Sequence, residues 1–177
     1  MVKLHDMFPS FLAQVAVATA LSSLASGLHA QVAPGGPFPS LAAAGLTGGT
    51  LPETAGSVLF VDFWASWCAP CKASFPAYSQ LQADYSGRGL VIVAVSVDEN
   101  PAAYAAFVAK LKPTFATLLD AKHTLVQEVQ VPTMPTSYLV DRSGKVRFIH
   151  AGFHGQQTER ELRREIDGLL GERQSAP

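Results

Sequence analysis

Two long apolar runs predict the centre of a β-sheet. The first covers Val58 to Trp64 and is interrupted only by Asp62, and the second covers Leu90 to Val97. Continuous runs rich in β-branched and aromatic residues are typical of buried strands in a sheet that is covered on both faces. Between them we predict a helix that begins at the Cys-Ala-Pro-Cys sequence 68–71 and ends at the Ser-Gly-Arg-Gly sequence 86–89. Strand, helix and strand in this order predict a right-handed crossover between parallel strands.

The second half of the chain continues the alternation of helices and strands. Helical spacing, apolar runs and turn residues predict a helix beginning at Asn100-Pro101, a strand at 115–119, a helix at 124–129, strands at 137–141 and 146–150 joined by a turn, and an amphipathic helix at 158–170. This alternation is typical of an α/β domain.

The pattern is weaker ahead of the first strand. The segment 31–40 is rich in proline and glycine, and we expect an extended, mobile linker there. The segment 41–54 contains Gly48-Gly49, which indicates a turn in a weak hairpin. We therefore place a single folded domain at 41–171, followed by a short tail at 172–177.

The first 30 residues have the layout of an export signal. Lys3 precedes a charge-free run from Met7 to Leu28 that consists largely of small and apolar residues. Such a run is typical of a secretory signal peptide, and it is also about long enough to span a bilayer as an anchor. In both cases we expect the domain to be exported to the periplasm or another compartment outside the cytoplasm.

Composition and charge fit an ordinary globular domain. The 177-residue chain is 48% hydrophobic and 15% charged, which is enough apolar material for one core beside the leader. Its net charge is −1, and neither sign forms a block. This distribution offers no basic surface for nucleic acid, so we exclude nucleic-acid binding.

Cys68 and Cys71 are the only cysteines, and their place between a strand and a helix indicates redox chemistry. Unpaired backbone N–H groups at the start of a helix favour a thiolate, so we predict Cys68 as the nucleophile. Cys71 lies one turn further on, and we expect it to be more buried and to resolve the mixed disulfide. A structural zinc site would need a second pair of ligands that the sequence lacks. A purely structural bridge would close so short a loop that it would add little stability.

The sequence VDFWASWCAPCK, from Val61 to Lys72, resembles the active-site signature of thioredoxins. The chain from about Pro37 to Leu170 is similar to the TlpA-like (ResA-like) extracytoplasmic branch of that superfamily. The resemblance implies a thioredoxin fold, with a central mixed sheet flanked by helices. It also implies that the segment from about 99 to 120 is the helix-plus-strand insertion of this branch.

The resemblance extends to Met134-Pro135, which matches the cis-proline motif of thioredoxin folds. In that family the loop lies against the cysteine pair, and the backbone of the residue before the proline pairs with the bound substrate. Pro132 is a second candidate for the cis residue, but Thr136 favours Pro135. For Met134, packing in the core is the alternative role.

Asp62 and Trp67 are the remaining candidate site residues. A carboxylate inside a buried strand is expected to have a raised pKa. In the thioredoxin pattern this aspartate lies below the resolving cysteine and shuttles its proton, whereas an outward-facing position at a strand end would give Asp62 no role. We expect Trp67 to shield the disulfide while it lies half exposed.

These features favour an extracytoplasmic thiol–disulfide oxidoreductase that reduces protein disulfides without a cofactor. The Ala-Pro dipeptide between the cysteines is closer to the Gly-Pro of reducing thioredoxins than to strongly oxidising relatives. We expect a monomer that a membrane electron donor re-reduces. Family analogy alone implies clients in cytochrome c maturation or metal-site assembly.

Two other functions fit parts of the pattern, whereas a peroxidase fits it less well. A disulfide-forming oxidant would use the same site in the opposite direction. A peroxidase normally has threonine three residues before its cysteine, where this chain has Ala65. A Cu(I) metallochaperone would bind the metal through both thiolates, with Met134 or a histidine as a third, soft ligand.

Overall fold

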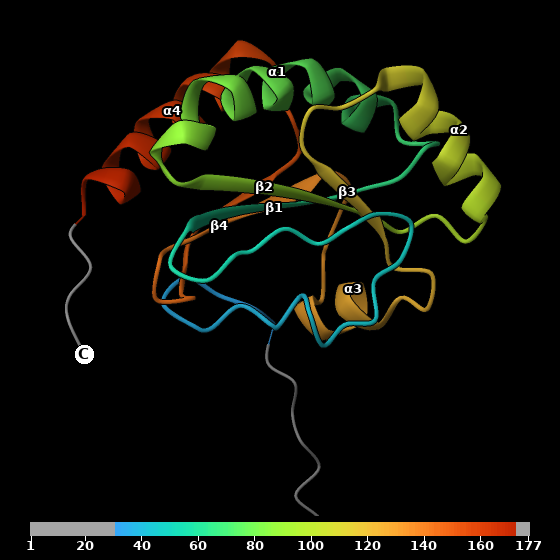
Figure 1. Ribbon diagram of the computed structural model, residues 1–177, viewed down its shortest axis with the longest axis horizontal. Helices are drawn as coiled ribbons and strands as arrows, with labels where there is room; N and C mark the ends of the chain where they lie inside the picture. The colour runs from blue at the N-terminus through green and yellow to red at the C-terminus, as the bar shows by residue number, and fades with distance from the viewer. Residues whose placement is uncertain (1–30, 173–177) are drawn as a thin grey trace, which may run out of the picture.

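The computed structural model describes residues 31–172, so the predicted leader at 1–30 and nearly all of the predicted tail lie outside the described residues. The helices and strands alternate as the sequence predicts (Figure 1). In chain order they are β1 (Val58–Trp64), α1 (Ala69–Tyr85), the 3₁₀ turn η1 (Ser86–Arg88), β2 (Leu90–Ser96), α2 (Pro101–Leu111), β3 (Ala116–Leu119), α3 (Thr124–Val129), β4 (Thr136–Val140), β5 (Val146–Ala151) and α4 (Gln156–Gly171). Within 31–172, no helix combines the length and apolar character that crossing a membrane requires.

The five strands form one mixed sheet in the order β3-β2-β1-β4-β5. β2 runs parallel to both β1 and β3, whereas β4 runs antiparallel to both β1 and β5. The predicted parallel pairing of the two long apolar strands and the mixed sheet are therefore confirmed. β1 lies at the centre, and all seven of its residues are buried.

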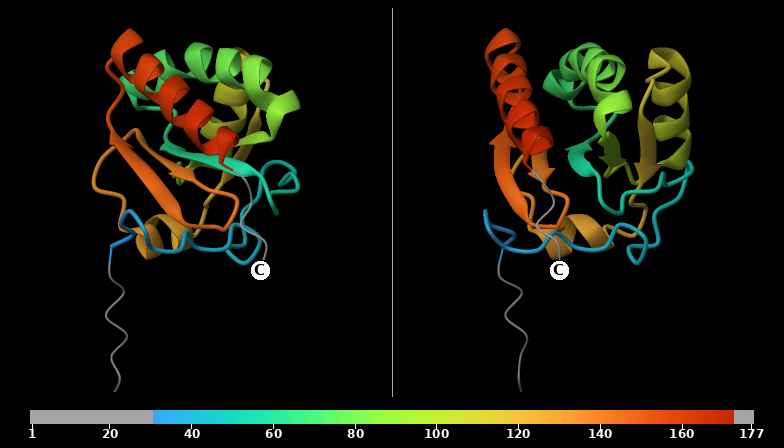
Figure 2. Two further views of the ribbon diagram at one scale, coloured as in Figure 1. Left: turned by 90° about the vertical axis from the view of Figure 1, so that its left-hand side faces the viewer. Right: turned by 60° about the vertical axis from the view of Figure 1, so that its left-hand side comes forward.

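Alternate residues of β1 point into two different hydrophobic clusters, as the period of a strand requires. Phe60 and Trp64 join the cluster that α1, α2 and α4 cover. Val61 and Phe63 join the cluster on the opposite face, beneath α3. Figures 1 and 2 show the three longer helices on one side of the sheet and α3 on the other. This double cover explains why β1 lacks the polar alternation of a surface strand.

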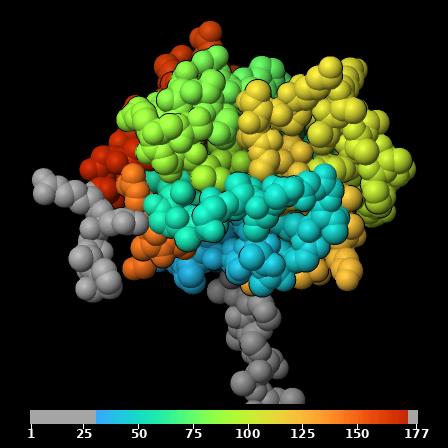
Figure 3. Space-filling model, viewed as in Figure 1, coloured from blue at the N-terminus to red at the C-terminus, as the bar shows by residue number. Residues whose placement is uncertain are grey.

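The segment 31–40 packs onto the domain, contrary to the linker we expected. The Phe38 backbone N–H donates to the Gly144 carbonyl oxygen at 3.0 Å. The Phe38 ring also lies 5.4 Å from the Tyr138 ring, centroid to centroid. Figure 3 shows the N-terminal part of the described chain, coloured blue to cyan, as a continuous layer on the body of the molecule. Backbone and ring contacts thus hold a stretch whose composition alone indicates a linker.

The expected hairpin within 41–54 is wrong. Thr47 forms an antiparallel bridge with Leu119 of β3, in which the two residues exchange backbone hydrogen bonds of 3.0 and 2.7 Å. Gly49 follows at a very close approach to β3, and a Cβ added there would collide with the Thr117 carbonyl oxygen. Gly49 therefore allows the segment to lie against the edge of the sheet, rather than forming the turn of a local hairpin.

We predict that Gly49→Ala destabilises the protein by roughly 1–3 kcal/mol, because the added methyl group must push the segment away from β3. Gly168→Ala in α4 is the matched control, since a Cβ there meets nothing within 4 Å. Alanine in a helix should leave the stability unchanged or raise it by about 0.5–1 kcal/mol. Urea unfolding of both variants measures the difference, and equal stabilities would contradict the close approach.

Candidate active site

Cys68 and Cys71 form a disulfide at the start of α1, with their Cα atoms 5.3 Å apart. Cys68 is the N-cap residue of the helix, and its Sγ accepts a hydrogen bond of 3.3 Å from the Cys71 backbone N–H. Pro70 lies in the first turn, where a helix does not need the N–H that proline lacks. The sequence thus starts the helix at the cysteine pair and directs backbone donors toward Cys68.

The two cysteines differ in their access to solvent. Cys68 retains 5% of its surface, whereas Cys71 is fully buried. This agrees with the expectation that Cys71 lies deeper. A substrate disulfide can therefore approach the pair only from the side of Cys68.

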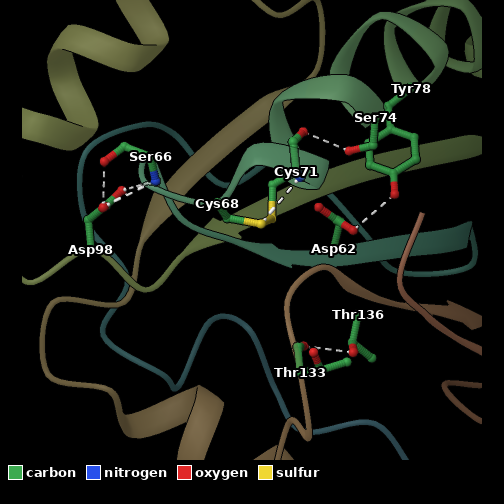
Figure 4. The surroundings of a disulfide bond; sticks show 9 residues. All are labelled: Asp62, Ser66, Cys68, Cys71, Ser74, Tyr78, Asp98, Thr133 and Thr136. Atoms are coloured by element: carbon green, nitrogen blue, oxygen red, sulfur yellow. Dashed lines mark hydrogen bonds between the residues drawn. A yellow bond between two sulfur atoms is a disulfide. The ribbon is translucent and has the colours of Figure 1, made fainter. Parts of the chain in front are cut away.

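Asp98 fixes the loop that joins β1 to the cysteines (Figure 4). Its buried carboxylate accepts hydrogen bonds from the Ser66 backbone N–H at 3.0 and 3.1 Å and from the Ser66 hydroxyl at 2.7 Å. The Ser96 hydroxyl donates a further bond of 2.7 Å. Sequence reasoning missed this anchor. Its signal was a carboxylate placed directly after a buried strand, where strand ends meet the active-site loop.

The fixed loop presents Trp67 to solvent, with 69% of its surface exposed. This is more exposed than the half-buried position we expected. The tryptophan that packs in the core is instead Trp64, which is fully buried and contacts Phe75 and Phe107. Trp67 therefore projects beside the disulfide as an available apolar contact.

Asp62 is fully buried on the face of β1 that α1 covers. Its Oδ1 accepts a hydrogen bond of 3.1 Å from the Tyr78 hydroxyl, whereas its Oδ2 is buried without a partner. In Figure 4 the Asp62 carboxyl lies between Tyr78 and the disulfide, and Oδ2 points toward the sulfur atoms. The outward-facing alternative for Asp62 is thus wrong.

Burial raises the pKa of Asp62 well above its ordinary value, and the hydrogen bond from Tyr78 opposes that shift only in part. No positive charge among the described residues contributes to this shift. Asp62 is therefore a carboxyl that retains its proton at a pH at which surface carboxyls have lost theirs. Such a group can take up or release a proton at a higher pH than an ordinary carboxyl does.

The Met134–Pro135 peptide bond is cis, as expected, and it leads directly into β4. The Thr136 hydroxyl donates to the Thr133 carbonyl oxygen at 2.8 Å, and the Gly152 N–H donates to the Pro135 carbonyl oxygen at 2.7 Å. Met134 is half-buried and packs against the cluster that contains both cysteines. The structure therefore brings this loop, the disulfide and Asp62 to one end of the sheet.

Metal-binding groups do not gather elsewhere in the described part of the chain. Within 31–172, no group of three or more histidine, cysteine, aspartate or glutamate side chains is arranged to hold a metal ion.

Fold and site together define a thioredoxin-fold protein with a redox-active cysteine pair, and known proteins agree. A family model described as the AhpC/TSA family matches residues 34–149. The thiol–disulfide oxidoreductase ResA of Geobacillus kaustophilus is 28% identical over 119 residues, which cover 67% of each chain. The thioredoxin-like protein YneN of Bacillus subtilis is 31% identical over 121 residues, which cover 67% of this chain and 68% of its own.

A solved structure matches the fold over a longer stretch. The crystal structure of a candidate thiol:disulfide interchange protein DsbE from Chlorobium tepidum has a TM-score of 0.73 and 35% identity, and the match covers 80% of this chain and 100% of that chain. The chain belongs to the AhpC/TSA family, and within it to the TlpA/ResA-like proteins of thioredoxin fold. It is a thiol–disulfide oxidoreductase that carries the Cys68–Cys71 pair.

The raised pKa of Asp62 predicts a pH-dependent cost in stability. From the unfolded pKa of about 4 upward, the unfolded chain has lost this proton while the native protein still holds it. The free energy of unfolding therefore falls as the pH rises toward the native pKa, by roughly 1.4 kcal/mol for each unit by which that pKa is raised. Asp62→Asn removes this dependence, and its amide oxygen can still accept from Tyr78.

We therefore expect oxidised Asp62→Asn to be more stable than the wild type at pH 8, with the smallest difference below pH 4. Urea unfolding of both oxidised proteins across this range gives the comparison. A difference that is the same at every pH would show that Asp62 titrates normally in the native protein.

Proposed function

We propose that this protein reduces disulfide bonds in protein substrates outside the cytoplasm. The Cys68 thiolate attacks a substrate disulfide, and one substrate sulfur leaves as a thiolate. Asp62 then takes the proton of Cys71, and the new thiolate attacks the Cys68 sulfur and releases the second substrate sulfur. The substrate gains two electrons, and the protein is left with the Cys68–Cys71 disulfide.

The observation that carries this proposal is the asymmetry of the cysteine pair. Cys68 caps α1, accepts a backbone N–H and is the only one of the two cysteines with accessible surface. Cys71 is buried on the side toward which the unpaired oxygen of Asp62 points. A thiolate favoured at the helix start suits the attacking sulfur, and a buried base suits the resolving one.

The surroundings of Cys68 support a protein as the substrate. Exposed Trp67 offers an apolar contact for a polypeptide. Met134, which precedes Pro135, would supply backbone hydrogen bonds to an extended substrate segment, as in the thioredoxin pattern. Relatives named thiol–disulfide oxidoreductases and a thiol:disulfide interchange protein favour the same substrate class.

The leader sequence and family analogy support the location and the partners that we propose. An export signal in 1–30 would place the domain in the periplasm or a similar compartment, either free or anchored. Thiols in such a compartment become oxidised to disulfides, and the reductase itself ends each cycle as a disulfide. It therefore needs a membrane electron donor that supplies two electrons per cycle. We propose cytochrome c maturation or metal-site assembly proteins as clients, and a monomer as the working form.

We predict that Cys71→Ser accumulates mixed disulfides on Cys68, because the resolving thiol is missing. Cys68→Ser is the matched control and should trap nothing, since Cys71 is fully buried. Non-reducing gels of both variants, expressed with their leader in the native compartment, measure the trapped species. Equal trapping by the two variants would contradict the assignment of Cys68 as the attacking sulfur.

The reduction potential tests the direction of the reaction. Equilibration of the protein with dithiothreitol or glutathione should give a value near the roughly −270 mV of thioredoxin. A value near the roughly −120 mV of a strong oxidant would assign the protein to disulfide formation instead. The disulfide content is read by alkylation of free thiols and mass spectrometry.

A further inference from the structure

We propose that Tyr78 is a positioning residue for the resolution step, because its hydroxyl holds Oδ1 of Asp62 and leaves Oδ2 to take the proton of Cys71. This inference rests on the proposed function of Asp62 and adds a residue that the thioredoxin signature does not contain. It assigns different roles to the two oxygens of a single carboxyl group.

Tyr78 is held in place from several sides. It lies on α1, seven residues after Cys71, and its side chain is fully buried. Its ring packs edge-on against Phe60 at 4.9 Å and against Phe153 at 5.9 Å, centroid to centroid. A ring fixed in this way gives its hydroxyl one position, 3.1 Å from Oδ1 of Asp62. The helix that carries the resolving cysteine therefore also orients the carboxyl beside that cysteine.

No other described group shares this task. In the sheet, Asp62 lies beside Ala94 of β2 and Ser137 of β4, and neither can carry a charge. Tyr78 and Cys71, both on α1, are the titratable groups on the side of the helix. Among the described residues, Tyr78 is the only group that donates a hydrogen bond to the Asp62 carboxyl. The orientation of the carboxyl consequently depends on one hydroxyl.

The Tyr78 hydroxyl stays protonated, and so remains a hydrogen-bond donor, even at a pH at which an exposed tyrosine would ionise. Burial, followed by the neighbouring charge of Asp62, raises the pKa of Tyr78 well above its ordinary value, and hydrogen bonds with Ser74 and Ser137 oppose this only in part. Tyr78 therefore keeps its proton and stabilises the ionised form of Asp62, which lowers the pKa of the carboxyl against the larger effect of burial. Without the hydroxyl, the carboxylate would have no donor at all.

The resolution step can now be written atom by atom. The Cys71 S–H bond breaks and its proton passes to Oδ2 of Asp62, while Oδ1 stays bonded to the Tyr78 hydroxyl. The Cys71 thiolate forms a bond with the Cys68 sulfur. The bond between Cys68 and the substrate breaks, and the substrate sulfur leaves with the electron pair. Tyr78 exchanges no proton, so its effect is on orientation and on the pKa of Asp62.

The test uses Tyr78→Phe, which keeps the ring and removes only the hydroxyl. We expect the Asp62 carboxyl, titrated by carbon-13 NMR in the oxidised protein, to have its midpoint at a higher pH than in the wild type. With a peptide disulfide as substrate, the plateau rate at saturation reports resolution and the slope at low concentration reports attack. The plateau at neutral pH should fall about tenfold, the scale of one hydrogen bond to a charged group, while the slope stays unchanged.

Tyr85→Phe is the matched control. Tyr85 lies on the same helix, is also buried, and its hydroxyl donates to Asp167 at 3.2 Å, so the variant loses the same kind of bond away from the disulfide. It should resemble the wild type in plateau, slope and Asp62 titration. Adding Tyr78→Phe to Asp62→Asn should cause no further loss of the plateau rate, because Tyr78 acts through Asp62.

Four results would overturn the inference, and they separate its failure from that of the proposed function. An unchanged Asp62 titration in Tyr78→Phe refutes the orienting bond. A further loss of the plateau rate when Tyr78→Phe is added to Asp62→Asn shows a merely structural role for the ring hydroxyl. An unchanged plateau in Asp62→Asn itself refutes the proton-transfer role of Asp62, and the inference fails with it. If Asp62→Asn resolves slowly but Tyr78→Phe resolves normally, the inference alone fails.

Discussion

The double pairing of β1 is the constraint on which the active site depends. Its antiparallel partner β4 begins at Thr136, opposite Phe63, so the cis-proline loop arrives beside the end of β1. Its parallel partner β2 ends at Ser96, opposite Trp64, so Asp98 arrives at the same edge. A slip of either register by one residue would reverse the faces of the strand and separate the loops. The apolar run that fixes the register therefore also assembles the site.

Sequence reasoning succeeded where one local pattern decides the structure. The long apolar runs fixed the two central strands, and the cysteine pair with Pro70 fixed the start of α1. It failed for 31–54, because proline- and glycine-rich stretches carry no periodicity and their position depends on distant partners. The Thr47 bridge joins residues 72 positions apart along the chain, and nothing local indicates it.

The same distinction applies within the active site. Cys68, Cys71 and Pro135 belong to compact motifs, and the burial of Asp62 follows from the strand that contains it. Tyr78 and Asp98 belong to no motif. In the sequence, Tyr78 occupies one apolar position of a predicted helix. Its hydroxyl reaches Asp62 only because the helix packs over β1. The polar contacts that orient the motif residues join segments that are distant in the sequence, so they cannot be predicted from a local sequence pattern.

The two buried acidic residues of the site, Asp98 and Asp62, differ in their hydrogen bonds, and this difference suits them to different roles. Asp98 accepts bonds from Ser66 and Ser96 on both of its oxygens, so both oxygens take part in holding the loop. Asp62 accepts one bond and keeps one oxygen bare, which is costly in a core unless that oxygen binds a proton. The unsatisfied carboxyl is thus suited to exchange a proton, and the satisfied one is suited to hold a loop. The chain places the first beside the disulfide and the second against the loop that leads to Cys68.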